Sequence, residues 1–309
     1  MFRAGMKSVA VVFFLLTLAS SALELPKNHL VSPEWLAKHM GEKGLVIVDT
    51  RKAETYRKGH IPGAVNLPKA LWFQGKMGSV PKLYNGPEEM NALLQKAGID
   101  SKSAVVFYSA GTVNKDFADA ASALWSLWIY GLRNTALLDG GFGHWTHKGG
   151  AVSHKIPKVQ TSDYEVERFD DGAVAALPQI LRAIYDEKIQ ISDARVSKFY
   201  LGEDKRKDLA RHGRIPTARL TPMIRQVKKE GSFYRLLDPK EAKSTLNNNG
   251  FGVETDRPLI IYCNTGHKAR GLWFVARFIV GMKEVSVYDG SMVEYSRTTL
   301  PVEEGEPMD

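Results

Sequence analysis

Residues 45–51 read Leu-Val-Ile-Val-Asp-Thr-Arg, and residues 189–195 read Ile-Gln-Ile-Ser-Asp-Ala-Arg. Each stretch is an apolar run that ends in polar residues, which is typical of a buried strand in a parallel sheet. Each is also followed by a related turn, Gly-His-Ile-Pro-Gly-Ala at 59–64 and Gly-Arg-Ile-Pro-Thr-Ala at 213–218. The same signal therefore occurs twice, and it predicts two copies of one fold.

The rest of each copy alternates strands with helices. Further strands are expected at 104–108, 135–138, 258–262 and 285–288, with helices between them at 113–130 and 268–280. Other helices are expected at 32–40, 87–97, 177–187 and 238–247. This alternation predicts an α/β fold made of two tandem domains, each a parallel sheet flanked by helices.

The domain boundaries follow from composition. Residues 148–162 are polar, contain Gly and Pro, and lack periodicity, as a linker does. We therefore expect a first domain at 28–150 and a second at 163–309.

The N-terminus has the pattern of a secretory signal. Arg3 and Lys7 precede the apolar residues 9–18, and small residues follow at 19–22. The apolar run is about half of the roughly 20 residues that cross a bilayer. We expect a signal peptide at 1–22, cleaved after Ala22, and a periplasmic or secreted protein. An uncleaved anchor or a buried helix is the alternative.

The overall composition is that of an ordinary globular protein. The 309 residues are 44% hydrophobic and 25% charged, with a net charge of +8, which suits about two domains. No run of five basic residues occurs, so no nucleic-acid partner is expected. No stable membrane association is expected after signal removal. The basic balance favours small anionic substrates.

Cys263 is the only cysteine, so it cannot form an internal disulfide. It ends an expected strand and is followed by a loop with Gly266 and by a helix start, a geometry whose N–H groups gather an anion. His267, Lys268 and Arg270 add positive charge. A thiol in this setting is expected to be largely thiolate and nucleophilic. The alternative is a lone cysteine that serves as a small buried hydrophobe.

Several motifs resemble one known family. They are Asp49-Thr50-Arg51 with residues 59–64, Asp139-Gly140-Gly141-Phe142, Asp193-Ala194-Arg195, and Asp289-Gly290-Ser291-Met292. Both copies resemble rhodanese domains, and the chain resembles the tandem-domain thiosulfate/3-mercaptopyruvate sulfurtransferases. The six-residue active-site loop of that family corresponds to residues 263–268. The resemblance implies that only the second domain is catalytic, because Ser109 occupies the cysteine position in the first.

The resemblance also implies roles for individual residues. Cys263 would carry sulfur as a persulfide, and Arg195 would grip the anionic end of the donor unless it forms a structural salt bridge. The rest of the loop would bind substrate through Asn264, Thr265, Gly266, His267 and Lys268. His267 either orients the donor or is solvated at the loop rim. Phe199, Arg214 and Thr217 depart from the family pattern.

The expected activity is sulfur transfer from a small anionic donor to cyanide or a thiol acceptor, without metal or organic cofactor. The neutral Asn264 and Thr265 resemble the loops of members that prefer 3-mercaptopyruvate. The expected export and the positive charge favour thiosulfate.

Other functions stay open. A phosphatase or arsenate reductase needs an arginine six positions after the cysteine, where this chain has Ala269, one residue before Arg270. Ser109 could serve as a hydrolytic nucleophile, although no flanking motif supports it. A non-enzymatic sulfur carrier that hands persulfide to a partner, or an inert structural cysteine, is compatible with the sequence.

Overall fold

The computed structural model describes residues 23–167, 169 and 171–307, so the expected signal peptide lies outside the described residues. The chain forms two five-stranded sheets in which every pairing is parallel. The first has the order β1 (Leu30–Val31), β7 (Thr135–Leu138), β6 (Ala104–Tyr108), β2 (Leu45–Asp49), β3 (Val65–Asn66). The second has the order β10 (Arg219–Leu220), β9 (Gln190–Asp193), β13 (Leu259–Tyr262), β14 (Val285–Tyr288), β8 (Val174–Ala175). The expected duplicated α/β fold is confirmed.

Helices cover the sheets. Those of the first half are α1 (Pro33–His39), α2 (Ala53–Arg57), η1 (Lys69–Trp72), α3 (Pro87–Ala97), α4 (Phe117–Ile129) and α5 (Gly141–His147). Those of the second are η2 (Asp171–Ala173), α6 (Leu177–Tyr185), α7 (Ser197–Tyr200), η3 (Met223–Gln226), α8 (Pro239–Asn247), η4 (Asn248–Gly250), α9 (His267–Phe274), η5 (Val275–Ile279) and α10 (Ser291–Tyr295).

One helix begins later than expected. The sequence predicts a helix from residue 113, but α4 starts at Phe117. The Asp116 carboxylate accepts hydrogen bonds from the backbone N–H groups of Thr112 (2.8 Å) and Val113 (3.0 Å). An aspartate that binds backbone amides in this way favours a turn over the first turn of a helix.

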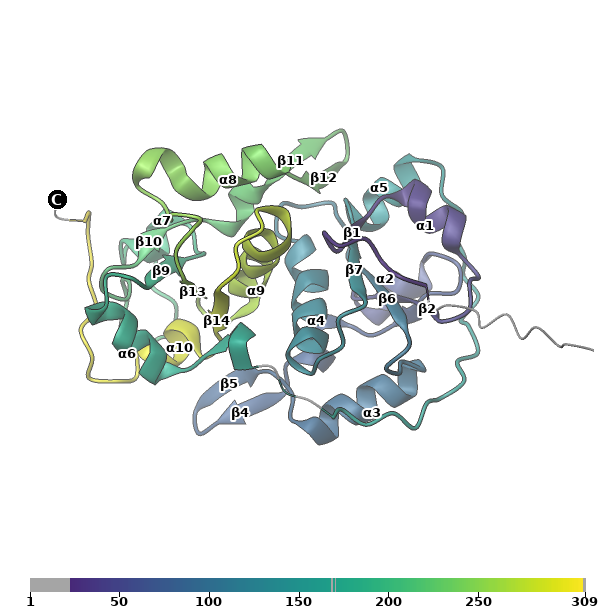
Figure 1. Ribbon diagram of the computed structural model, residues 1–309, viewed down its shortest axis with the longest axis horizontal. Helices are drawn as coiled ribbons and strands as arrows, with labels where there is room; N and C mark the ends of the chain where they lie inside the picture. Colours follow the sequence, from purple (N-terminus) through teal and green to yellow (C-terminus); the bar gives the residue numbers. More distant parts are fainter. Residues whose placement is uncertain (1–22, 168, 170, 308–309) are drawn as a thin grey trace, which may run out of the picture.

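The two halves share one hydrophobic core, because α4 and α9 lie side by side between the sheets (Figure 1). A Cβ atom on Gly271 of α9 would lie 3.0 Å from the Cβ of Ala118 on α4. Trp125 and Trp273 are fully buried in the same core. Small residues thus bring the helices together, and the large indoles fill the space around them.

Each sheet carries an Asp-x-Arg pair at the end of a central strand. In the first domain, Arg51 makes a bidentate contact with Asp49 and donates to the carbonyl of Gly59 (2.8 Å). The Tyr108 hydroxyl donates to Asp49 (2.7 Å) and accepts from the N–H of Ile61 (3.2 Å). This network fastens the Gly-His-Ile-Pro turn to the sheet.

The same turns also hold the chain that leaves each domain. His60 contacts the carbonyl of Lys155 at 3.1 Å, while Arg214 donates to the carbonyl of Gly305 (2.6 Å) and pairs with Glu303 (3.2 Å). Arg214 therefore replaces His60 in the same tethering role.

Two β-hairpins cross between the domains. They are β4–β5 (Gly75–Met77, Val80–Leu83) and β11–β12 (Val227–Glu230, Phe233–Leu236). After the first hairpin, the N–H of Tyr84 donates to Asp289 (3.0 Å); in the second, the N–H of Leu236 donates to Asp139 (3.2 Å). Each hairpin therefore reaches the carboxyl edge of the other domain's sheet.

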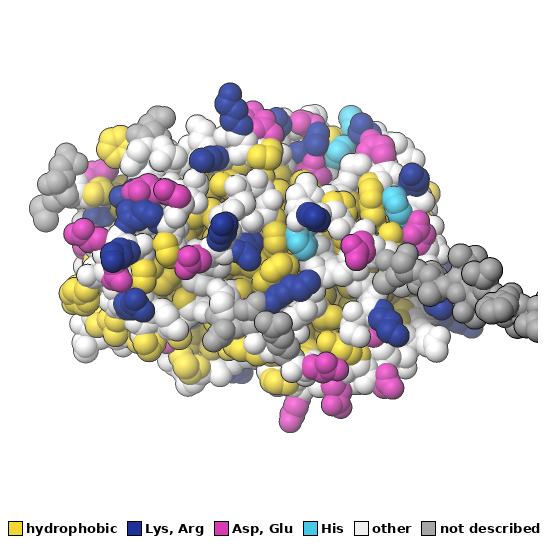
Figure 2. All heavy atoms as spheres, viewed as in Figure 1, with side chains coloured by type: hydrophobic (Ala, Val, Ile, Leu, Met, Phe, Trp, Pro, Cys, Tyr) yellow, Lys and Arg dark blue, Asp and Glu magenta, His cyan; other side chains and the backbone are white. Residues whose placement is uncertain are grey.

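The described helices are all too short or too polar to cross a bilayer. Basic and acidic side chains are interspersed on the face shown in Figure 2 rather than gathered into one patch.

Candidate active site

Cys263 directly follows β13, the middle strand of the second sheet, and precedes the N-terminus of α9. Its side chain is 3% exposed. The loop reverses at Gly266, whose φ of +77° is a conformation that glycine adopts without strain. This is the carboxyl edge of a parallel sheet, where such folds place their ligands.

Ser291 holds the loop in place through hydrogen bonds to its backbone. Its hydroxyl accepts hydrogen bonds from the N–H groups of Cys263 (3.1 Å) and Gly266 (3.0 Å), and donates to the carbonyl of Tyr288 (2.9 Å). Two of the N–H groups that the sequence assigns to anion binding are therefore used by the protein. Those of Asn264 and Thr265 donate to no other described residue and stay available.

We predict that Ser291→Gly lowers the activity expected of this site about tenfold or more, because two buried N–H groups lose their acceptor at roughly 1–3 kcal/mol each. Ser291 has φ +50°, and the matching residue of the first domain is Gly141 at φ +58°, so glycine fits the backbone. Steady-state kinetics and thermal unfolding would be measured together. Unchanged kinetics would show that these hydrogen bonds are dispensable.

Arg195 is occupied by the protein. It makes a bidentate contact with Asp193 and donates to the carbonyl of Gly213 (2.7 Å) and to Asn264 (3.3 Å), with 1% of its side chain exposed. The network repeats that of Arg51 in the first domain, which has no thiol. The geometry therefore favours the structural salt bridge, with Arg195 supporting the loop through Asn264, over donor binding.

A cavity of about 380 Å³ opens beside the loop, between the domains. Its polar lining comes from Lys69, Lys82, Arg206, Thr265, His267 and Arg270. Of the expected site residues, only Thr265 and His267 line it. Lys69 and Lys82 come from the first domain, and they and Arg206 were not among the residues expected from the sequence. The basic run at 205–207 is the one local signal that pointed to Arg206.

Lys268 and Arg206 lie within the electrostatic reach of the thiol. Burial is the largest influence on Lys268 and lowers its pKa, while negative charge on Cys263 opposes that shift. The pKa of Arg206 is raised chiefly by its hydrogen bond to Asp208 (2.8 Å), with a contribution from Cys263. Both cations would stabilise a thiolate or persulfide anion at Cys263.

Arg270 does not clamp an oxyanion. It pairs with Asp289, donates to the carbonyl of Lys82 (3.3 Å), and stacks on Phe73 with 3.6 Å between the guanidinium carbon and the ring centre. Arg270 is therefore held by these contacts and does not supply the oxyanion-binding arginine that a phosphatase needs.

His267 is held by the first domain. Its Nε2 lies 2.7 Å from the Asp119 carboxylate on α4, and Lys69 binds the same oxygen at 2.8 Å. Its backbone carbonyl accepts a hydrogen bond from Ser122 (3.3 Å). His267 lines the cavity with 28% of its side chain exposed, so donor orientation stays a prediction.

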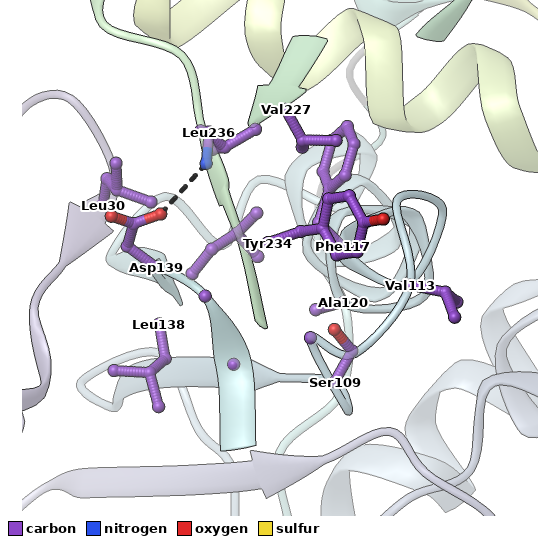
Figure 3. Close-up of a pocket in the computed structure, with 14 residues that line it drawn as sticks. Leu30, Ser109, Val113, Phe117, Ala120, Leu138, Asp139, Val227, Tyr234 and Leu236 are labelled. Atoms are coloured by element: carbon purple, nitrogen blue, oxygen red, sulfur yellow. Dashed lines mark hydrogen bonds between the residues drawn. The ribbon is translucent and has the colours of Figure 1, made fainter. Parts of the chain in front are cut away.

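The matching site of the first domain is closed (Figure 3). The space around Ser109 has a volume of about 20 Å³, and Tyr234 from the second domain's hairpin lines it. A Cβ atom on Gly111 would lie 1.9 Å from the carbonyl oxygen of Gly140, and one on Gly141 2.4 Å from that of Ser109. The loop is packed backbone to backbone, which leaves no room for a hydrolytic substrate.

Comparison with known proteins gives a consistent result. A model of the rhodanese-like domain matches residues 32–148 and 177–298. A 3-mercaptopyruvate sulfurtransferase from Escherichia coli is 27% identical over 286 residues, which cover 88% of this chain and 97% of that protein. A thiosulfate sulfurtransferase from Corynebacterium glutamicum is 26% identical, covering 90% and 91% of the two chains. The sulfur carrier protein TtuD from Thermus thermophilus is 26% identical, covering 90% and 97%.

Solved structures share the fold. The crystal structure of SseA from Escherichia coli, described as having the rhodanese fold, superposes with a TM-score of 0.73 at 24% identity, covering 85% of this chain and 98% of that one. An anaerobic ergothioneine biosynthesis enzyme from Chlorobium limicola gives a TM-score of 0.76 at 23% identity, covering 91% and 71%.

Proposed function

The chain belongs to the tandem-domain rhodanese family of sulfurtransferases, and on that premise we propose that it moves sulfane sulfur from thiosulfate to cyanide or a thiol through a persulfide on Cys263. The observation that carries the proposal is the position of the only thiol of the chain, at the carboxyl edge of the second sheet and at the start of a loop whose Thr265 and His267 line a cavity rich in cations.

The reaction has two half-reactions that balance without a cofactor. The Cys263 thiolate attacks the outer sulfur of thiosulfate; the sulfur–sulfur bond of the donor breaks, and sulfite leaves with the bonding electrons. The acceptor then attacks the terminal sulfur of the Cys263 persulfide, and Cys263 is released as a thiolate. The acceptor becomes thiocyanate or a new persulfide. Ping-pong kinetics follow from this order.

The charges of the cavity support thiosulfate. Lys69, Lys82 and Arg206 line it, and a dianion gains more from such cations than the single carboxylate of 3-mercaptopyruvate does. The neutral Asn264 and Thr265 resemble the loops of members that prefer 3-mercaptopyruvate, so this compound is the alternative donor.

The test is thiocyanate formation from cyanide with each donor in turn. Faster turnover with thiosulfate supports the proposal, and faster turnover with 3-mercaptopyruvate changes the assigned donor. Absence of turnover with both, while Cys263 is still rapidly alkylated, supports the carrier function that is named for the Thermus thermophilus relative.

We predict that Arg206→Gln lowers kcat/KM for thiosulfate about tenfold, since hydrogen bonds to charged groups contribute about 1.5–3 kcal/mol and Arg206 is partly solvated. Its side chain is 35% exposed. Arg257→Gln is the matched control, because Arg257 is 30% exposed and pairs with Glu254 but does not line the cavity. Equal effects of the two changes would argue against donor binding by Arg206.

We also propose that the chain is exported, from the pattern of charged, apolar and small residues at 1–22. Cell fractionation with N-terminal sequencing of the mature protein tests this: a start at residue 23 supports cleavage after Ala22, and an intact N-terminus contradicts it.

A further inference from the structure

We propose that His267 and Asp119 form an acid–base pair across the domain interface, in which His267 takes the proton from a thiol acceptor and Asp119 positions the imidazole. This inference rests on the proposed function and extends it to the second half-reaction. It gives the first domain a part in the chemistry although that domain has no thiol.

The geometry fixes the pair. His267 is the first residue of α9, and Asp119 lies on α4, the helix that packs against α9 across the domain interface. Asp119 Oδ1 is 2.7 Å from His267 Nε2 and 2.8 Å from Lys69 Nζ. The two side chains are 28% and 21% exposed, so the pair is largely shielded from solvent.

The hydrogen bond selects the tautomer. Burial tends to raise the pKa of Asp119, but contacts with His267 and Lys69 outweigh it and lower that pKa. Asp119 is therefore a carboxylate, which accepts hydrogen bonds and cannot donate them. The proton of the neutral imidazole must then lie on Nε2, which leaves a lone pair on Nδ1. No described residue hydrogen-bonds that nitrogen, and His267 is one of the residues that line the cavity.

The surroundings keep the imidazole neutral. Burial is the largest influence on the pKa of His267 and lowers it; the positive charges of Lys69 on η1 and Arg270 on α9 act in the same direction, against the raising effect of Asp119. Lys82 on β5 and Arg206 add positive charge at the cavity wall. His267 is thus available as a base to a lower pH than a free histidine would be.

Only one step of the reaction needs such a base. Attack on thiosulfate releases sulfite without proton transfer, so the first half-reaction needs no base. A thiol is mostly protonated at neutral pH and must lose its proton to attack. In the proposed step the proton passes to His267 Nδ1 as the new sulfur–sulfur bond forms. The bond from Cys263 to the transferred sulfur breaks, and Cys263 leaves as a thiolate.

The experiment compares two steps in the full-length mature protein: sulfite release as thiosulfate loads Cys263, and transfer from the loaded Cys263 to dithiothreitol. The variants are His267→Gln and Asp119→Asn. We expect His267→Gln to slow transfer to dithiothreitol about a hundredfold, as loss of a general base does, and this loss should far exceed any change in the rate of sulfite release. Asp119→Asn should slow the dithiothreitol reaction about tenfold, within the range of positioning effects.

The pH profile separates catalysis from structure. In the wild type, kcat/KM for dithiothreitol should be level above the pKa of His267 and fall as acid protonates it. In His267→Gln this plateau should be lost, and kcat/KM should rise with pH in step with the dithiothreitol thiolate. Raising the pH until dithiothreitol ionises should reduce the deficit of that variant. His39→Gln on α1, far from the cavity in sequence and absent from its lining, is the control and should behave as the wild type.

The outcomes are distinct. Equal losses in the two steps, or a pH profile of His267→Gln with the same shape as that of the wild type, would overturn the inference while leaving the proposed function in place. If His267→Gln unfolds, the isosteric Asp119→Asn gives the same comparison. A wild type that releases no sulfite from thiosulfate would instead refute the proposed function.

Discussion

Replacing Cys263 with serine should abolish sulfur transfer from both donors, with a fall in turnover of at least about a thousandfold, as loss of a catalytic nucleophile produces. A hydroxyl cannot hold transferred sulfur as a persulfide. The fold should survive, because the side chain is small and 3% exposed, and serine is nearly its size. The measurement is thiocyanate formation, together with the mass gain of one sulfur atom on the wild-type chain after thiosulfate treatment.

A thiol placed in the first domain is the matched control. Ser109→Cys in the Cys263→Ser background restores the number of thiols but puts the thiol at the closed site, beneath Tyr234. This double variant should be inactive. Activity in Cys263→Ser itself would refute the persulfide mechanism.

Replacing Arg270 with methionine should destabilise the protein by about 3–5 kcal/mol, the effect of breaking a buried ion pair from one side. Asp289 is 5% exposed and Arg270 1% exposed, so the change leaves a buried carboxylate without its cation. It also removes the guanidinium from Phe73, above which it stacks at 3.6 Å. Urea unfolding followed by tryptophan fluorescence would measure the loss.

The control removes both charges. Arg270→Met with Asp289→Asn should be clearly more stable than Arg270→Met alone, because no unpaired charge remains. In the wild type, Asp289 accepts a hydrogen bond from the N–H of Tyr84. Asparagine at this position can still accept that bond through its side-chain carbonyl oxygen. If the double variant is no more stable than the single one, the loss in free energy of unfolding comes from the lost stacking and packing of Arg270 and not from the unpaired charge of Asp289.

The fold could be predicted from the sequence because its signals are local. Apolar runs ending in Asp-x-Arg gave the two central strands, and the strands at 104–108, 135–138 and 285–288 match the structure. The predicted ends of helices were less accurate than the strands. At α4, for example, the side chain of Asp116 accepts a hydrogen bond from the N–H of Thr112 and favours a turn where a helix was expected. A single hydrogen bond of that kind does not change the spacing of apolar residues, so the sequence pattern does not reveal it.

The site was only half predictable, for a physical reason. The loop at 263–268 is contiguous, so its position beside a strand and helix could be inferred. Lys69 and Lys82 reach the cavity, and Asp119 reaches His267, only because α4 packs on α9 and the β4–β5 hairpin crosses between the domains. No pattern in the sequence predicts that contact. For Arg195 the sequence left two roles open, donor binding by resemblance and a structural salt bridge, because the local motif is the same for both. The structure shows the salt bridge with Asp193, as for Arg51 with Asp49 in the first domain.

The close approach of Gly111 to Gly140 has a consequence for how the two halves came to differ. After duplication, loss of a reactive residue can be reversed by one substitution only while the space around it persists. Here the backbone has settled into that space, and a side chain at either Gly111 or Gly141 would collide with it. A cysteine at position 109 alone would therefore not restore a site in the first half, because the backbone around Gly111 and Gly141 would also have to move.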